Sequence, residues 1–476
     1  MSDYNFLMEI RLAPEQLRTL NFLGRIAASQ GLNLYLVGGA VRDLTYGMSN
    51  VRDLDFAVVG GAQKLLRALN SPPSAKAKSR AIPGVQEEHP HIEVLQQHLD
   101  ARQQVATVVF APGVRAEISA TRLERYSKPG GAPAISPAGI FEDLKRRDFS
   151  INAMAVSLHP NSRGLLLDPT NGAADIERHE LRVLHSRSFL DDPSRIYRLI
   201  RLSLRLNFKP EAKTQAWLDQ AMEQKAWQGV NPEQQGREIH EILREEDPGR
   251  LLKLLGERGL LAGLDDHLSA KKMPLAQFDK IRAAGRNLPG ADPFLLYFSA
   301  LSEKLPPAYR VKFAKKVLGD GKLAQAATRL DAEARKVAQE LKGRKRNTPS
   351  EVYHLLSGIP PFVLLYMLVN FQQAPVQSRL KKFLFKYPQV RAKLPREELL
   401  SLGLEPGQKF EEVLQKIFIA QIDGKIKTQP QLTKALRAFS GIAGPPAHPP
   451  APEKTTHPKT VKEAAAVSHK IQHKKR

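Results

Sequence analysis

The stretch "LVGGAVRDLTYGMSNVRDLDFAVV", which begins at Leu36, constrains the fold more than any other part of the chain. Its apolar runs flank a Gly-Gly pair and a short helical segment, so the pattern predicts a strand, a turn, a helix and a second strand. The glycines, an Arg-Asp pair and an Asp-x-Asp are the residue types that hold phosphates and their metal ions. We therefore expect the chemistry of the chain to lie here.

Strand patterns continue to about residue 160, and helical patterns follow from Asp191 to about Phe439. The strings "LYLVG", "LDFAVVG", "QVATVVF", "VRAEIS" and "INAMAVSL" have the composition of strands. Residues 10–30 have apolar residues at helical spacing, and Gly31 then ends the helix. The order of elements predicts an α+β protein with a mixed α/β head and an all-helical remainder.

Three stretches have the composition of loops. The stretch from Ser71 to Pro90 is rich in Pro, Ser and Lys and predicts a mobile insertion, and the stretch from Ser127 to Gly139 predicts a second flexible loop. From Gly444 onward the chain has too few apolar residues to bury a core, which predicts a disordered basic tail.

Length and charge narrow the class of protein. The chain has 476 residues, which predicts two to four domains, since single cores stop growing at roughly 250 to 300 residues. Its 72 Lys and Arg residues exceed its 49 Asp and Glu residues, for a net charge of +23. This excess favours a polyanionic partner, nucleic acid first and an anionic membrane surface second, over a merely solvated basic surface.

The composition also excludes several kinds of site. The chain contains no cysteine, so disulfides, thiolate zinc sites and cysteine nucleophiles are excluded, and any metal must bind oxygen or imidazole. The N-terminal "MSDYNFLMEIRL" lacks the apolar core of a signal peptide, and the run "IPPFVLLYMLVNF" from Ile359 is too short to span a bilayer. We expect a cytoplasmic protein that does not enter a membrane.

The Asp-x-Asp of "RDLDFAVV" predicts a metal site. Side chains alternate along a strand, so Asp53 and Asp55 project to one side while Leu54 projects to the other. A divalent cation such as Mg²⁺ would remove the repulsion between the two carboxylates. In "VRAEISATR", Glu117 either supplies a third carboxylate, if its strand is a neighbour, or is an ordinary exposed strand residue.

The Gly-Gly pair predicts a phosphate site beside these carboxylates. Gly38 and Gly39 follow a strand and precede a helix, so backbone amides can approach a phosphate where any Cβ would obstruct it. Arg42 follows as an anion-binding side chain. In "DLKRRDFSINAMAV", Arg146 and Arg147 are further candidates for phosphate, and Asp148 for a ribose hydroxyl.

The string "FLDDPSRIYRLIRLSLRLNF" predicts a helix with a cationic stripe. Asp192 and Pro193 have the pattern of an N-cap followed by proline at the first helical position. The stripe consists of Arg195, Arg198, Arg201 and Arg205, which are costly to bury unless acids or an anion satisfy them. A carboxylate and a guanidinium, such as Asp192 and Arg195, can pair with the base edge of adenine or cytosine and reject guanine and uracil.

Together these strings resemble the bacterial class II tRNA nucleotidyltransferase and poly(A) polymerase family. Its hallmark strings occur in order as "LVGGAVRD", "RDLDF", "ATRLERY", "DLKRRDFSINAMAV" and "DDPSRIYRLIRLSLRL", covering residues 34–208. A weaker match, "LGLEPGQKFEEVLQKIFIAQIDGKIKT" from Leu402, is similar to the helical tail of the family.

The resemblance implies a Polβ-like nucleotidyltransferase head followed by an all-helical neck, body and tail. With the sequence pattern it predicts an N-terminal helix at 1–30, the head at 31–184, the neck at 185–255, the body and tail at 256–440 and a disordered basic tail at 441–476. The chain departs from the family at Asp191, where a glutamate is usual, and in the insertion from Ser71 to Pro90, which replaces a more regular helical segment.

The resemblance also implies a role for each candidate residue. The catalytic carboxylates would be Asp53, Asp55 and Glu117, of which Asp53 and Asp55 would bind Mg²⁺. The nucleotide-binding residues would be Gly38, Gly39, Arg42, Arg147, Asp148, Asn152, Asp192, Arg195, Arg198 and Arg201. The loop from Ser127 to Gly139 would correspond to the one that members use when switching from C to A addition.

The implied activity is template-independent transfer of CMP or AMP from CTP or ATP to the 3′ end of a tRNA, with release of pyrophosphate. Full CCA addition, A addition alone and poly(A) synthesis on other RNA 3′ ends share these motifs, and we favour tRNA. A rival of another class is a catalytically inactive RNA-binding protein. Basic patches of the helical region would contact RNA phosphates: Lys312, Lys315 and Lys316; Lys342 to Arg346; and Lys381, Lys382 and Lys386.

Overall fold

The computed structural model describes residues 3–48, 51–70, 92–100, 104–288, 290–319, 321–343 and 348–442. The predicted insertion from Ser71 to Pro90 and the predicted basic tail beyond Ile442 lie outside these ranges. The chain divides into two units, which are described separately: Met1–Ala334 with Pro361–Val369, and Arg335–Pro360 with Asn370–Arg476.

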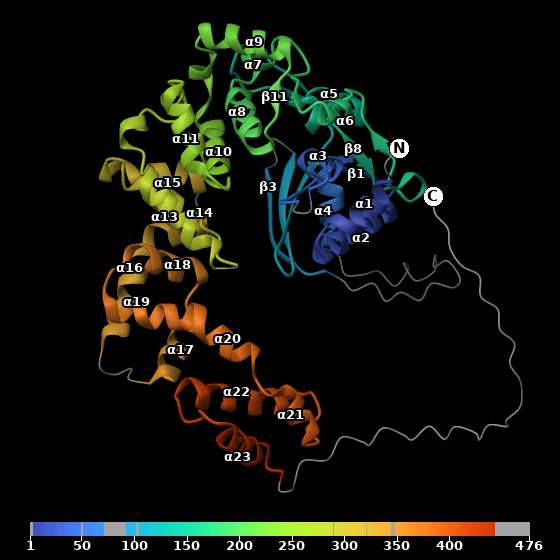
Figure 1. The fold of residues 1–476 in the computed structure, drawn as a ribbon. Coiled ribbons are helices and arrows are strands. Elements are labelled where there is room, and N and C mark those ends of the chain that lie inside the picture. The colour runs from blue at the N-terminus through green and yellow to red at the C-terminus, as the bar shows by residue number, and fades with distance from the viewer. Residues whose placement is uncertain are drawn as a thin grey trace, which may run out of the picture. The chain divides into compact units, whose positions relative to one another are not determined.

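The first unit begins with the predicted α/β head (Figure 1). Its helices are α1 (Tyr4–Arg11), α2 (Pro14–Ser29), α3 (Gly39–Tyr46), α4 (Ala62–Leu69), α5 (Ile140–Lys145) and α6 (Gly172–Glu177). Its strands are β1 (Asn33–Val37), β2 (Leu54–Val59), β3 (Val94–Asp100), β4 (Val105–Phe110), β5 (Val114–Ala120), β6 (Arg122–Arg125), β7 (Ala134–Pro137), β8 (Ala155–Ser157), β9 (Leu166–Leu167) and β10 (Glu180–Leu181).

The predicted N-terminal helix is two helices, because Pro14 begins α2 as a separate element after α1. Of the predicted strands, "INAMAVSL" forms a strand only at Ala155–Ser157, since Ser150–Asn152 is a single 3₁₀ turn. The predicted flexible loop from Ser127 to Gly139 is partly wrong. It contains β7, whose backbone pairs with β6 in an antiparallel hairpin.

Within the described residues the head sheet has seven strands in the order β3-β4-β5-β2-β1-β8-β9. Strands β2 and β5 run parallel, and the other neighbouring strands run antiparallel. Helix α5 packs through Ile140 and Leu144 against Val37, Ala57 and Ala155 of the sheet. Because Ala57 and Asp55 are two residues apart on β2, α5 covers the face that carries Asp55.

The rest of the first unit confirms the predicted change from mixed α/β structure to helices. Its elements are α7 (Ser188–Asp191), α8 (Ser194–Leu206), α9 (Ala212–Glu223), α10 (Pro232–Leu243), α11 (Pro248–Glu257), α12 (Leu261–Leu264), α13 (Leu275–Arg286), α14 (Phe294–Ser302), α15 (Arg310–Leu318) and α18 (Pro361–Asn370). A two-residue strand, β11 (Lys209–Pro210), pairs with β10. Helix α16 (Lys322–Lys342) contains the division between the units.

The second unit is helical in its described residues. Its elements are α17 (Pro349–Ser357), α19 (Ala374–Lys381), the π-helical turn η7 (Lys382–Lys386), α20 (Tyr387–Ala392), α21 (Arg396–Ser401), α22 (Gln408–Ile422) and α23 (Gln429–Ser440). Leu399, Phe410, Leu414 and Leu436 bring α21, α22 and α23 into one core. The mixed head and helical remainder confirm the predicted α+β class.

No single helix among the described residues is long and apolar enough to cross a membrane. Helices α17 and α18 reach that length and apolarity only when they are counted as a pair.

Candidate active site

The two aspartates lie at the start of strand β2. Asp55 is the second residue of β2, and Asp53 directly precedes the strand rather than lying within it. Leu54 and Phe56, which alternate with them, are buried at 0% and 1% exposure. Burial of this apolar pair fixes the pleat, and the carboxylate of Asp55 therefore lies on the opposite face.

Glu117 lies in a strand that neighbours the strand of Asp55, as a third carboxylate of the site requires. Strand β5 pairs with β2, and Glu117 is the residue in register with Asp55. Desolvation by the surrounding protein raises the pKa of Asp55 well above its ordinary value, and the negative charges of Glu117 and Asp53 raise it further. The three carboxylates thus form one concentration of negative charge, although a catalytic role for Glu117 stays a prediction.

The donor set of this cluster fits a divalent cation. Carboxylate oxygens are the ligands that Mg²⁺ prefers, and a cation between Asp53 and Asp55 would offset the repulsion that raises the pKa of Asp55. Among the described residues, no group of three or more His, Asp or Glu side chains is arranged to hold a metal ion. Two carboxylates joined by substrate phosphates and water are a common ligand set for Mg²⁺.

The Gly38–Gly39 turn lies against the carboxylates, as predicted. Gly38 has a positive φ of 70°, and a Cβ on it would lie 3.4 Å from an Asp55 carboxylate oxygen and 3.3 Å from Arg147 Nη1. A Cβ on Gly39 would lie 3.5 Å from Arg42 Nη2. The two glycines therefore keep a space open between acids, guanidinium groups and the backbone amides that begin α3, where a phosphate can be bound.

Arg42 is buried at 3% exposure and is the start of a hydrogen-bonded chain. Its Nη1 donates to Asn152 Oδ1 at 2.7 Å, and Asn152 Nδ2 donates to Asp148 Oδ1 at 3.1 Å. Asp148 Oδ2 lies 3.7 Å from Arg198 Nη1. Burial alone would raise the pKa of Asp148, but Arg198 and the bond from Asn152 outweigh it and hold that pKa below its ordinary value.

The sequence did not predict the two aspartates that hold these guanidinium groups. Asp43 accepts from Arg42 Nε at 2.9 Å and Nη2 at 2.7 Å, and it lies 3.4 Å from Arg205 Nη2 of α8. Asp143, which has no exposed surface, accepts from Arg147 Nη2 at 2.9 Å. Asp43 is one residue from Arg42 in the sequence and Asp143 is four residues from Arg147, and this short spacing could have predicted both ion pairs.

Asp192 and Arg195 lie together, as the base-edge prediction requires, but both are buried and hydrogen-bonded. Arg195 Nε is 3.6 Å from Asp192 Oδ2, and Arg195 Nη1 donates to Ser188 Oγ at 2.6 Å. Asp192 Oδ1 accepts from the backbone N–H of Ser194 at 3.1 Å and from Gln234 Nε2 at 2.9 Å. The N-cap position itself falls on Pro193, one residue later than predicted.

The arginine stripe of α8 is satisfied by acids, one of the two alternatives that its burial demanded. Arg198 Nε donates to Glu238 Oε1 at 2.8 Å. Arg201 Nη1 lies 3.5 Å from Glu241 Oε2 and 3.4 Å from Glu245 Oε1. These acids come from α10 and its end, and their spacing of three and four residues matches that of the arginines, which was a signal that the sequence analysis missed.

Arg244 is a further residue that the sequence did not predict. It follows the last residue of α10, and its Nη1 donates to Asp53 Oδ2 at 2.9 Å while its Nη2 lies 3.4 Å from Asp53 Oδ1. A candidate metal carboxylate is thus joined to the helix whose acids hold the arginine stripe.

In the first predicted RNA-binding patch, one lysine is held by the protein itself. Lys316 Nζ donates to the carbonyl oxygen of Leu264 and to Asp265 Oδ2, both at 2.8 Å, so its charge serves the packing of the first unit. Lys312 lies over the ring of Tyr309, at 5.9 Å from its centroid. Of the patch from Lys342 to Arg346, the last three residues lie outside the described ranges.

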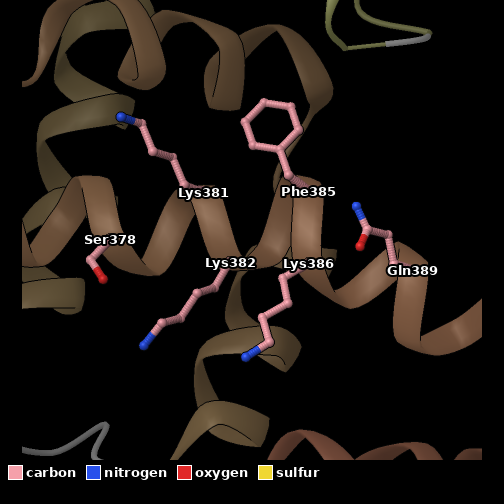
Figure 2. Close-up of a pocket in the computed structure, with 6 residues that line it drawn as sticks. All are labelled: Ser378, Lys381, Lys382, Phe385, Lys386 and Gln389. Carbon is pink, nitrogen blue, oxygen red and sulfur yellow. The ribbon is translucent and has the colours of Figure 1, made fainter.

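The third patch has a hollow in the second unit (Figure 2). Its volume is about 460 Å³, and it is lined by Ser378, Lys381, Lys382, Phe385, Lys386 and Gln389. Lys382 and Lys386 point to the same side in Figure 2. The three lysines make no ion pair within the described residues, in contrast to the paired arginines of α8.

Residues 34–182 match the model of the poly A polymerase head domain. An A-adding tRNA nucleotidyltransferase of Halalkalibacterium halodurans is 29% identical over 444 residues, which are 91% of this chain and 95% of that protein. An A-adding tRNA nucleotidyltransferase of Geobacter sulfurreducens is 26% identical over 446 residues, 89% of this chain and 47% of that protein. A CC-adding tRNA nucleotidyltransferase of Deinococcus radiodurans is 35% identical over 257 residues, 53% of this chain and 62% of that protein.

The chain spans about half the length of the Geobacter relative and nearly all of the Halalkalibacterium relative. The head-domain match begins at Leu34 and ends at Arg182, close to the predicted head boundaries. The resemblance stated from the motifs is therefore confirmed: residues 34–182 match the poly A polymerase head domain, and the chain is similar to bacterial tRNA nucleotidyltransferases.

Proposed function

We propose that this protein adds nucleotides to the 3′ end of tRNA without a template, using ATP or CTP and releasing pyrophosphate. The observation that carries the proposal is the juxtaposition of Asp55 with Glu117 in the next strand and with the Gly38–Gly39 turn. Carboxylates for a cation and backbone amides for a phosphate are the parts that phosphoryl transfer requires.

Each part of the site has a task in this reaction. The Gly38–Gly39 turn and Arg147 would hold the triphosphate, and Asp148 would accept a hydrogen bond from the ribose. Asp192 and Arg195, exchanging their present partners for a base, would admit adenine or cytosine. Asp53 and Asp55 would bind Mg²⁺, which when bound supplies charge neutralisation and activation of the RNA 3′-hydroxyl. No covalent intermediate with the protein is required.

The hollow on η7 would contact RNA outside the active site. Three lysines without acidic partners favour phosphates, and Phe385 offers a ring on which a base can stack. A π-helical turn is an uncommon conformation that often occurs at functional sites, and it lies at Lys382–Lys386.

A tRNA-processing enzyme meets its substrate in the cytoplasm, which is where we place this chain.

The product separates the forms of this activity. Purified protein, Mg²⁺ and one tRNA ending at the discriminator base, at C or at CC are incubated with CTP, ATP or both, and products are sized on a sequencing gel. Completion of CCA from the shortest form identifies a CCA-adding enzyme, and a single A added only to the CC form identifies an A-adding enzyme. Long A runs on any end identify a poly(A) polymerase. Absence of extension contradicts the proposal and favours an RNA-binding protein.

A further inference from the structure

The contact between Arg244 and Asp53 concerns a residue that the proposed mechanism does not use. Arg244 presents two nitrogens to the two carboxylate oxygens of Asp53, at 2.9 Å and 3.4 Å. A divalent cation bound by Asp53 needs the same oxygens, at 2.0 to 2.1 Å for Mg²⁺. A guanidinium and a dication are both positive, so they repel each other at such distances.

The neighbouring residues make a second, crossed ion pair. Arg52 Nη2 lies 3.3 Å from Glu245 Oε2, next to the pair of Asp53 with Arg244. Each of the two adjacent segments thus contributes one arginine and one acid, and each arginine pairs with the acid of the other segment. We call these four residues the crossed pair. It joins the segment before β2 to the end of α10, and one of its two bonds uses a candidate metal ligand.

Asp55 differs from Asp53 in this respect. Within the described residues Asp55 makes no ion pair, whereas Asp53 is bound by Arg244. A cation approaching the site would therefore meet one carboxylate that no arginine holds in an ion pair and one that Arg244 already engages.

We propose that Arg244 competes with a divalent cation for Asp53, so that cation binding releases Arg244 and weakens the crossed pair between β2 and α10. The inference rests on the proposed function for the metal role of Asp53. The two equilibria are linked. If the contact between Arg244 and Asp53 lowers the affinity for the cation by some factor, bound cation lowers the equilibrium constant for forming that contact by the same factor. Arg244 is thus a positioning residue that couples occupancy of the metal site to the helix carrying Glu238 and Gln234.

A merely structural role for Arg244 predicts the opposite sign. If Arg244 only held the site in shape, its removal would weaken cation binding. The side chains of Arg244 and Asp53 are 22% and 32% exposed, so the pair is partly buried, and the folding of each variant is measured alongside its cation binding.

The test measures Mn²⁺ binding to the full chain without nucleotide, from the electron paramagnetic resonance signal of free Mn²⁺. Arg244→Gln should bind Mn²⁺ about five-fold more tightly than the parent, the upper range for release of a partly exposed ion pair. The matched control Arg52→Gln removes the same charge from the same crossed pair and leaves the Asp53–Arg244 contact in place. It should tighten Mn²⁺ binding by less than about two-fold, through long-range charge alone.

Asp53→Asn separates the two ideas. If Asp53→Asn binds Mn²⁺ as the parent does, the metal assignment fails and the competition fails with it. If Asp53→Asn loses binding but Arg244→Gln binds no more tightly than Arg52→Gln, the competition is overturned while the metal assignment stands. Circular dichroism melts of all variants establish that each comparison is made on folded protein.

Discussion

Asp55 shows at the scale of one residue how a cluster of carboxylates destabilises the fold that holds it. Its carboxylate is desolvated and faces Glu117 and Asp53, so its pKa is higher in the folded chain than in the unfolded chain. An acid with a raised folded pKa destabilises the fold fully at any pH above the folded pKa. The destabilisation is lost as the pH falls through the folded pKa toward the unfolded value.

We therefore predict that Asp55→Asn stabilises the chain when divalent cations are removed with chelator. At pH 7.5 the gain should appear as a higher Tm, and it should shrink as the pH is lowered toward the pKa of an ordinary carboxyl group. Calorimetry at several pH values measures both. A lower Tm at pH 7.5, or a gain that does not vary with pH, would contradict this account of Asp55.

Glu238 is a buried acid that contacts two arginines of the stripe. It is buried at 2% exposure and bonds Arg198, with Arg201 Nη2 3.7 Å from its other oxygen. Removing one partner of a buried ion pair typically costs about 3 to 5 kcal/mol, because an uncompensated charge stays behind. We expect Glu238→Ala to cost about 3 kcal/mol in urea unfolding.

The control for Glu238 is Glu246→Ala, which breaks the exposed pair with Arg286. It should cost no more than a few tenths of a kcal/mol. Equal effects of the two variants would mean that the buried acid does not stabilise the stripe.

At the scale of elements, the packing of α10 against α15 depends on one glycine. A Cβ on Gly236 would lie 2.0 Å from the backbone carbonyl oxygen of Lys316, a contact that no side-chain movement relieves. Because α10 also carries Gln234 and Glu238, displacement of this helix would disturb the partners of Asp192 and Arg198.

We predict that Gly236→Ala destabilises the chain by about 1 to 3 kcal/mol, as overpacking does, and raises the KM for ATP. Gly285→Ala on α13 is the matched control, since the nearest atom to its Cβ is Pro293 Cβ at 3.9 Å. That variant should be neutral or slightly stabilising, because alanine reduces the entropy of the unfolded chain. Urea melts and initial rates measure the two effects; equal stability of both variants would contradict the packing argument.

How far the sequence predicts these elements depends on the range of the interaction. Alternation along β2 and the turn residues before α3 are local, so Asp55, Gly38 and Arg42 could be placed from the sequence alone. The bond from Arg198 to Glu238 joins residues 40 apart, and that from Arg244 to Asp53 joins residues 191 apart. Neither follows from local periodicity, because each requires the path of α10 across the first unit.

Strand β3 shows the same limit for secondary structure. Its sequence VLQQHLD is mostly polar and half-exposed, and its hydrogen bonds to β4 rather than its own pattern define it as a strand. The hairpin of β6 and β7 was missed because Gly and Pro are frequent in the segment that connects the two strands, while the backbone pairing extends over four residue pairs.

At the scale of the whole molecule, the charges are arranged unequally. The arginines of α8 are neutralised internally, whereas the lysines of the η7 hollow have no acidic partners within the described residues. The basic excess available to a polyanion therefore includes the second unit, although the head holds the candidate chemistry.

We predict that Lys381→Gln, Lys382→Gln and Lys386→Gln together weaken tRNA binding and reduce the slope of log Kd against log salt by about 2. Filter binding at several salt concentrations measures both. The control removes equal charge from the exposed Lys409, Lys416 and Lys434 of the same unit. If the control weakens binding as much, net charge rather than the hollow is responsible.

The most direct test of the account is single-turnover addition of nucleotide to tRNA ends by the parent chain, Asp53→Asn and Asp55→Asn with Mg²⁺. The account predicts that the parent extends tRNA and that each variant is at least about a hundred-fold slower. The reason is that Asp53 and Asp55 would bind the cation whose positive charge stabilises the negative charge of the transition state. Both variants should still be folded and bind tRNA. Extension at the parent rate by either variant would contradict the assignment of this site.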